Sequence, residues 1–178
     1  MIKKIIVNFF VFCFLYSSNV YSSNIAVFNL EFVFNEINSY KFFIEQVEIY
    51  KNNIETNLKL REQDLIDQNN EIESSSLILN DDEMNEIIQI YQKNLSNFQK
   101  NVQKYNEVIN LNIDTQKNFI LNKIASICKN ISIEKNFDII LTENNYFLSS
   151  ENIDISNFII TNLNNLNLIL EFNENIND

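Results

Sequence analysis

Carboxylates dominate the residues of this sequence that could take part in chemistry. The 178 residues include 24 Asp and Glu and 13 Lys and Arg, but no His and no Gly. Histidine is the commonest general base and metal ligand, and a phosphate-binding loop cannot be built without glycine. Two acidic clusters, Asp64 with Asp67 and Asp81 to Glu83, have the spacing of an acid–base pair or a cation site. Exposed helix faces and helix starts produce the same spacing, so we predict no catalytic residue, no metal site, no cofactor and no enzyme activity.

Cysteine and charge narrow the function classes further. Cys128 is the one cysteine outside the N-terminal apolar run, and Ile124, Ile127 and Ile131 flank it at helical spacing. A cysteine in that setting is a small buried residue rather than a nucleophile. The formal net charge is −11, and the basic residues are scattered singly. Nucleic-acid binding needs clustered Lys and Arg to neutralise phosphates, so we exclude nucleic acid as a partner.

Residues 1–22 have the pattern of a secretory signal peptide. Two lysines precede the apolar run Ile5–Tyr16, and Val20 and Ser22 occupy the −3 and −1 positions of a cleavage site. The apolar run is too short to cross a bilayer comfortably, because a span needs about 20 residues. We predict cleavage after Ser22, and the loss of two lysines then lowers the net charge from −11 to −13. An uncleaved N-terminal anchor is the alternative.

Two long segments carry the periodicity of a coiled coil. Apolar residues recur at alternating steps of three and four from Ile44 to Ile72, with polar interruptions, and from Met84 to Ile109 without any. A second step of four then leads to Ile113, which is a stutter that locally unwinds a supercoil. Between the segments, Asn80 precedes three acidic residues and has the pattern of a helix N-cap with a capping box. We predict two helices that fold back antiparallel.

Strand-like pieces flank the helices at both ends of the chain. IAVFNL (25–30), FDIILT (137–142) and NYFLSS (145–150) have strand composition, and residues 154–163 indicate a short helix capped by Asp154 or Ser156. Three short strands are too few for a stable independent sheet. Oligomerisation adds strands and covers edges, so we expect these pieces to meet in an assembly of several chains.

The order of these pieces resembles the Skp/OmpH family of periplasmic chaperones. The likeness lies in the signal peptide, the opening IAVFNLEFVFNE, the charged helical hairpin and the closing EKNFDIILTENNYFLSSENIDISNFIITNLN, and it covers about residues 24–163. The family opens with a strand and a helix containing V-[FL]-N-E, and it closes with E-K-G-[YF]-D-[LIV]-[VI]-L before D-I-T and a last helix. Asn136 stands where the family has glycine, and asparagine can adopt the same left-handed conformation.

The resemblance implies a mainly α fold with a small β body. A long antiparallel coiled-coil hairpin and three short strands would assemble as a homotrimer shaped like a jellyfish. The body is expected over residues 23–36 and 131–163, the arm over 37–130 and a C-terminal tail over 164–178. The tail has no counterpart in the family, and it either extends the last helix or forms an acidic tail. The residues expected in the trimer body are Ile25, Val27, Leu30, Phe137, Ile139 and Leu141.

The resemblance also implies a function. Three hairpins would enclose a cavity in the periplasm that binds unfolded outer-membrane β-barrel proteins and keeps them soluble for delivery to the outer membrane. No nucleotide or metal is involved. The family's best-studied members are basic, and their positive surface helps attract acidic clients and lipopolysaccharide. The acidic charge of this chain argues against lipopolysaccharide as a partner.

Apolar residues outside the helical seams are the candidate wall of that cavity. They are Ile66, Ile87, Ile90, Phe43 and Tyr50. The alternative is that these residues pack against the sibling helix or the body, and it is favoured for Phe43 and Tyr50, which lie near the base.

A second function is open at this point, namely a secreted structural coiled-coil spacer or envelope tether that binds no client. The strand-like pieces at both ends favour the chaperone, because a plain coiled coil does not need them.

Overall fold

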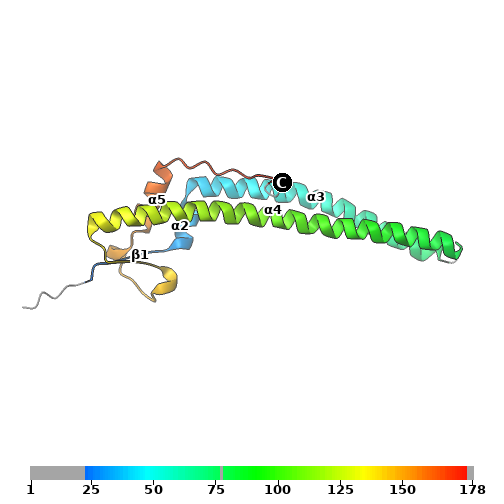
Figure 1. The fold of residues 1–178 in the computed structure, drawn as a ribbon, viewed down its shortest axis with the longest axis horizontal. Coiled ribbons are helices and arrows are strands. Elements are labelled where there is room, and N and C mark those ends of the chain that lie inside the picture. Colours follow the sequence, from blue (N-terminus) through cyan, green and yellow to red (C-terminus); the bar gives the residue numbers. More distant parts are fainter. Residues whose placement is uncertain (1–22, 77, 176–178) are drawn as a thin grey trace, which may run out of the picture.

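A long helical hairpin extends from a small body at one end of the molecule (Figure 1). The computed structural model describes residues 23–76 and 78–175, so the predicted signal peptide lies outside the described residues. The elements in chain order are β1 (Ile25–Phe28), α2 (Leu30–Glu36), α3 (Asn38–Ser75), α4 (Asp81–Lys135), β2 (Ile139–Thr142), the 3-10 turns η1 (Glu143–Asn145) and η2 (Glu151–Ile153), and α5 (Ser156–Asn165).

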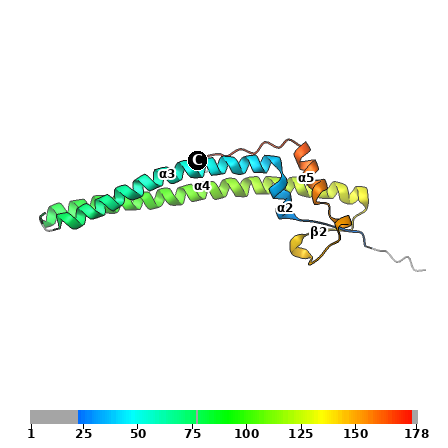
Figure 2. The same ribbon diagram turned by 180° about the vertical axis from the view of Figure 1, so that it is seen from behind.

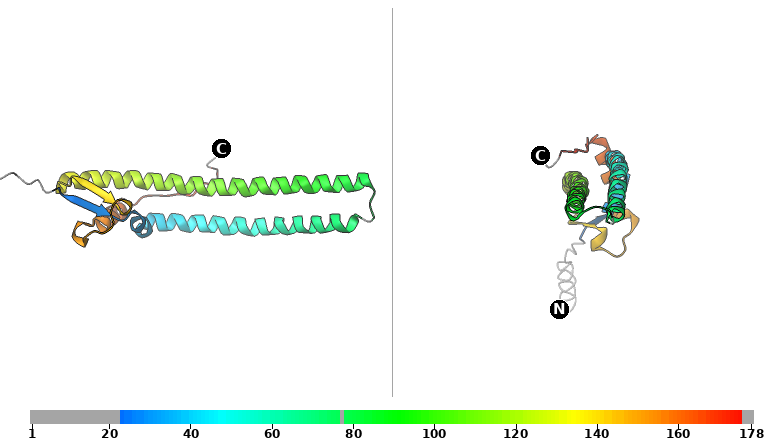
Figure 3. Two further views of the ribbon diagram at one scale, coloured as in Figure 1. Left: turned by 90° about the horizontal axis from the view of Figure 1, so that it is seen from below. Right: turned by 90° about the vertical axis from the view of Figure 1, so that its right-hand side faces the viewer.

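Helices α3 and α4 form the predicted antiparallel hairpin. They contain 38 and 55 residues, which at 1.5 Å per residue gives lengths of about 57 and 82 Å. The two helices run side by side along the whole of α3 (Figure 3). Because α4 is longer, its C-terminal part continues past the start of α3 and lies beside the strands of the body. In the described part of the chain, no helix is both long and apolar enough to cross a membrane.

Local capping chemistry sets both ends of α4. The Asn80 side chain accepts hydrogen bonds from the N–H groups of Asp82 and Glu83, each at 3.0 Å, and Glu83 accepts one from the Asn80 N–H. This is the predicted capping box. At the other end, Asn136 has φ 54° and ψ 44°, and its N–H donates to the Ser132 carbonyl. The left-handed conformation expected of Asn136 is confirmed, and it ends the helix as glycine commonly does.

The sheet joins the two ends of the described chain. Strands β1 and β2 pair in parallel, with Ile25 opposite Ile139. Asn24 secures the start of this pairing, because its N–H donates to the Asp138 carboxylate at 2.8 Å and its carbonyl accepts from the Asp138 N–H at 2.8 Å. The Asn24 side-chain amide also donates to the Lys135 carbonyl at 2.9 Å. Two of the expected strands, 25–30 and 137–142, are therefore present over residues 25–28 and 139–142, and they pair within one chain.

The prediction of a third strand over residues 145–150 is wrong for the chain described here. Asn145 is the last residue of the 3-10 turn η1, and residues 146–150 form no strand. The reason is a long-range contact of Glu143, whose carboxylate accepts from the N–H groups of Leu30 at 2.8 Å and Glu31 at 3.4 Å. By capping the first turn of α2, Glu143 turns the chain away from the sheet.

A separate short helix precedes the first arm helix. Residues 30–36 form the seven-residue helix α2, and α3 begins at Asn38. Ile37 interrupts the helical path with φ −75° and ψ 120°, and its side chain is completely buried in the body core. The burial of Ile37 stabilises a break that no local signal in the sequence indicates.

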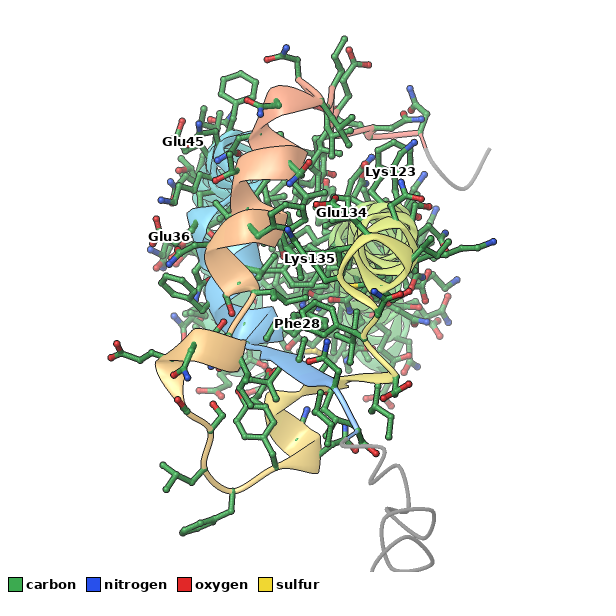
Figure 4. All side chains as sticks on the ribbon, turned by 90° about the vertical axis from the view of Figure 1, so that its left-hand side faces the viewer. Phe28, Glu36, Glu45, Lys123, Glu134 and Lys135 are labelled. Carbon is green, nitrogen blue, oxygen red and sulfur yellow. The ribbon has the colours of Figure 1, made fainter. Side chains whose placement is uncertain are left out.

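The hydrophobic core lies in the body and at the base of the arm. Figure 4 views this end of the molecule, with Phe28 toward the middle of the body and Glu36 and Glu45 at its outer side. The largest completely buried apolar side chains come from α2, α3, α4 and α5 and from the residue between α2 and α3. They are Val33, Ile37, Phe43, Ile120, Ile159 and Leu163.

The tail, residues 166–175, runs back along the arm (Figures 1 and 2). Asn167 has φ 46°, and the described residues after it, 168–175, form no helix and no strand. Leu170 is only 3 % exposed, and the ring of Phe172 lies 4.6 Å from that of Tyr50 between centroids. The tail therefore does not extend the last helix, and it packs against α3 and α4 instead of standing free.

Replacing Asn136 by glycine tests the helix end. Asn136→Gly should raise the free energy of unfolding by about 0.5 kcal/mol, since glycine adopts the left-handed region without the steric cost of a Cβ. The measurement is urea unfolding at fixed protein concentration. Asn130 is an exposed residue inside α4, and Asn130→Gly is the matched control, which should lower stability by a few tenths to about 0.5 kcal/mol. If both variants changed the free energy of unfolding in the same direction, the left-handed conformation of Asn136 would be contradicted.

Candidate functional site

The acidic clusters are parts of helix faces and helix ends. Asp81, Asp82 and Glu83 form the first turn of α4, where negative charge is favourable. Asp67 accepts a hydrogen bond from Gln63 on the same helix face. Within residues 23–76 and 78–175, no group of three or more His, Cys, Asp or Glu side chains is placed to hold a metal ion. Cys128 is half-buried, and burial raises the pKa of its thiol, which keeps it in the less reactive protonated form.

The arm becomes loosely packed away from the body. Between Val47 and Val108, Leu65 is the one side chain that is buried among the residues the structure describes. The seam residues of both helices are otherwise half-buried or exposed, because two helices alone cover only a narrow stripe of each other. The distal arm therefore presents apolar side chains without a closed core of its own.

Two hollows flank the Leu65 contact. One has a volume of about 350 Å³ and is lined by Ile66, Tyr91, Leu95 and polar residues of α3. The other, of about 330 Å³, is lined mostly by polar side chains and includes Arg61. Leu65 and Phe98 line both hollows. Both hollows between α3 and α4 are thus bordered by the same apolar pair, Leu65 and Phe98.

The three predicted cavity-wall residues of the distal arm are each partly exposed to solvent. Ile66 is 48 % exposed and Ile90 is 52 % exposed, while Ile87 is half-buried. Ile87 precedes Tyr91 by one helical turn, and Tyr91 lines the same hollow as Ile66. Ile66 thus lines this hollow, while Ile87 and Ile90 lie on the part of α4 between the hollow and the start of that helix at the tip.

The two candidates near the base have other surroundings. Phe43 is completely buried in the core, so it is removed from the candidate surface. Its position on the inner face of α3, beside Tyr40, gives it a packing role. Tyr50 lies under the tail, and burial first, then the nearby Glu174 carboxylate and Tyr105, raise the pKa of its phenol. Packing was the favoured alternative for both residues.

The residues expected in a trimer body differ in burial. Val27 is buried within the chain, and Leu30, Phe137, Ile25 and Leu141 are half-buried.

Ile139, on β2, is exposed, and so are Phe147 and Leu148 in the following loop. These three apolar side chains of the body are uncovered within the described chain.

The distal arm is strongly acidic. Between Arg61 and Lys93 the sequence has nine carboxylates and no basic residue. We call this set the acidic tip. It consists of Glu62, Asp64, Asp67, Glu71, Glu73, Asp81, Asp82, Glu83 and Glu86. Glu62 lines the first hollow, and Asp64 lines the second together with Arg61, so carboxylates of the acidic tip lie at both.

Sequence reasoning missed one buried polar residue. Asn112 lies inside α4 and is 1 % exposed. It follows the stutter at Ile109 and precedes Ile113, and an asparagine between two seam isoleucines was the available signal, because asparagine is a poor helix former. The polar residues Arg61 and Gln68, on either side of Leu65 in the seam, were the corresponding signal for the hollows.

Comparisons with known proteins agree on one family and one fold. Residues 24–163 match the protein-family model described as "Outer membrane protein (OmpH-like)". The fold is similar to a crystal structure of a candidate outer membrane chaperone (OmpH-like) from Caulobacter crescentus CB15, with a TM-score of 0.70 and 10 % sequence identity over 85 % of this chain and 90 % of that chain. No curated protein matches the sequence. At this identity the structural likeness is one of fold.

Shortening Leu65 tests the loose packing of the arm. Leu65→Ala should lower the local stability of the distal arm by about 2 kcal/mol, at the low end for a buried leucine because hollows already flank the site. Hydrogen exchange in peptides near residues 65 and 98 should accelerate, while exchange near Ile124 in the body stays unchanged. Leu60 is exposed, and Leu60→Ala is the control, with an expected change of less than about 0.5 kcal/mol. Faster exchange throughout the body in Leu65→Ala would contradict a local role.

Proposed function

The chain belongs to the OmpH-like family of outer membrane proteins, and from that premise we propose that it is a periplasmic holding chaperone for unfolded outer-membrane β-barrel proteins. The observation that carries the proposal is the distal arm, where Leu65 is the one buried side chain described between Val47 and Val108 while apolar residues remain partly exposed. Such a surface offers an unfolded chain many weak apolar contacts. The Caulobacter protein of similar fold is described as a candidate chaperone, which supports this role.

Three copies would join through their bodies and surround a cavity with their arms. The uncovered surface at Ile139, Phe147 and Leu148, and the short two-stranded sheet, support this assembly because a sheet of this size is not stable alone. Several arms acting together provide avidity without any strong single contact. The proposed function needs no catalysis and no cofactor.

The client wall is assigned to Ile66, Ile87 and Ile90. Their side chains sit on a part of the hairpin that has little core, so the helices can adjust to differently shaped clients at small cost. Holding requires such adaptability, because an unfolded chain presents no fixed shape.

Charge sets the client preference. The acidic tip favours basic or neutral segments and repels acidic ones, and it disfavours the phosphates of lipopolysaccharide. The predicted route to the periplasm is export through the signal peptide, with cleavage after Ser22.

A holding assay combined with mass measurement tests the function. The mature chain should have the mass of a trimer and should keep a β-barrel protein soluble after dilution from urea, as measured by light scattering. A monomer or dimer without holding activity would support the structural spacer instead.

Serine at three positions tests the client wall. Ile66→Ser, Ile87→Ser and Ile90→Ser together should weaken client binding about tenfold, equivalent to about 1.4 kcal/mol, because partly exposed side chains lose only part of their apolar contact. The mass of the assembly should not change. Ile133 is exposed on α4 near the body, and Ile133→Ser is the matched control, with unchanged binding. Equal affinity of the triple variant and the unmodified protein would remove these residues from the wall.

Salt should separate clients by charge. An acidic barrel protein should bind more tightly as salt increases, since the screening length falls from about 30 Å at 0.01 M to about 10 Å at 0.1 M. A basic client should show the opposite response. Replacing Glu71, Glu73 and Glu86 by Gln, which spares the capping box of α4, should reduce both responses. The same salt response for both clients would show that the tip does not act on them.

A further inference from the structure

Side-chain amides hold the main chain of the tail. The Gln46 amide donates to the Leu170 carbonyl and accepts from the Phe172 N–H, both at 3.2 Å. The Asn112 amide donates to the Asn173 carbonyl and accepts from the Asn173 N–H, both at 2.8 Å. Side chains of α3 and α4 thus bond to main-chain groups of the tail, and these bonds do not depend on which side chains the tail carries.

A third amide completes the row. Gln116 donates to the Glu171 carbonyl at 3.2 Å. Gln46 and Asn112 each combine one donor and one acceptor, so each side chain pairs with a peptide as a neighbouring β-strand does. Asn112 is 1 % exposed, and its amide also donates to the Val108 carbonyl at 2.8 Å. When the tail leaves, the buried Asn112 amide loses two hydrogen bonds, so another main chain with free peptide groups is favoured in its place. We call the groove formed by Gln46, Tyr50, Asn112 and Gln116 the amide channel.

The side chains of the tail alternate between the channel and the solvent. Leu168, Leu170 and Phe172 are buried or half-buried, whereas Ile169 and Glu171 between them are exposed. Phe172 packs on Tyr50, and Leu168 and Leu170 border a hollow shared with α3. Side chains that alternate in this way with a period of two are characteristic of extended chain.

The tail shares one feature with a membrane β-strand, which is an apolar side chain at every second position from Leu168 to Phe172. Strands of outer-membrane barrels alternate apolar and polar residues over about ten positions. The amide channel contacts the peptide groups of such a segment and every second side chain, which must be apolar. It makes few contacts that depend on the other side chains of the segment. The tail is therefore a segment of this chain with the chemistry of the proposed clients.

We infer that the amide channel is a binding site for extended segments with an apolar side chain at every second position. The tail of the same chain occupies this site, and a strand of an unfolded β-barrel protein displaces the tail and binds there instead. The inference rests on the proposed function. It assigns a second contact area, nearer the body than the Ile66 region, and makes the tail a competitor of the client.

The tether determines how strongly the tail competes. A flexibly linked segment has an effective concentration of about 1 mM. If the free tail peptide binds the channel with a Kd of about 0.1 mM, the tethered tail occupies it about nine-tenths of the time and weakens client binding there about tenfold.

Removing the tail tests the inference. The comparison is between the full mature chain and a chain that ends at Asn167, with labelled peptide NLILEFNEN, residues 167–175, as the first probe. Fluorescence anisotropy should show peptide binding to the shortened chain and binding at least about tenfold weaker to the full chain. The second probe is a β-barrel protein diluted from urea, which the shortened chain should hold about tenfold more tightly.

Variants separate recognition from folding. In the shortened chain, Gln46→Ala with Asn112→Ala should abolish peptide binding, whereas Gln103→Ala with Asn106→Ala, two exposed amides of α4, should not. In the full chain, Leu170→Ser with Phe172→Ser should release the channel without removing any residue. Ile169 is 80 % exposed in the tail, and Ile169→Ser is the matched control, which should behave as the full chain. These full-length variants keep the test valid if the shortened chain does not fold, as judged by helical circular dichroism.

The outcomes divide cleanly. Tighter client holding after tail release, cancelled by the Gln46 and Asn112 substitutions, supports the inference. Equal holding by all chains overturns it and leaves the proposed function intact. Absence of holding in every chain overturns the proposed function, and the client part of the inference falls with it.

Discussion

The parallel pairing of β1 with β2 is the interaction on which the rest of the structure depends. It joins residues 25–28 to residues 139–142 across more than a hundred positions of chain, and it thereby brings the start of α3 and the end of α4 to one place. Asn24 and Asp138 fix the register from one end. Once the strands are paired, α2 and α5 can pack over the base of the arm, and the hairpin has an anchored end.

Packing then declines along the molecule. At the base, Ile37, Phe43, Ile120 and Ile159 are completely buried among elements from both ends of the chain. In the described part of the arm beyond Val47 and before Val108, the two helices pack against each other, and only Tyr50 is also shown packing on Phe172 of the tail. One chain thus combines a closely packed base with a loosely packed arm, and the proposed holding of unfolded proteins would use both.

The features predicted correctly from sequence arise from nearby residues. The helical seams, the capping box at Asn80 and the left-handed Asn136 each depend on side chains within a few positions, so their chemistry is visible in the sequence. The features that were missed depend on distant partners. Glu143 turns the chain away from the sheet because it caps α2, the break at Ile37 exists because the core buries that side chain, and Asn112 is satisfied by the tail. No local pattern contains such partners.

The acidic tip has a mechanical consequence wherever two arms approach each other. Nine carboxylates at the end of each hairpin repel the same nine on a neighbour, and the repulsion becomes appreciable once the separation falls to about the screening length, roughly 8 Å at physiological salt. Charge repulsion therefore limits how closely two neighbouring tips can approach each other. In the proposed trimer, this repulsion would keep the apolar surfaces of neighbouring arms apart when no client is bound.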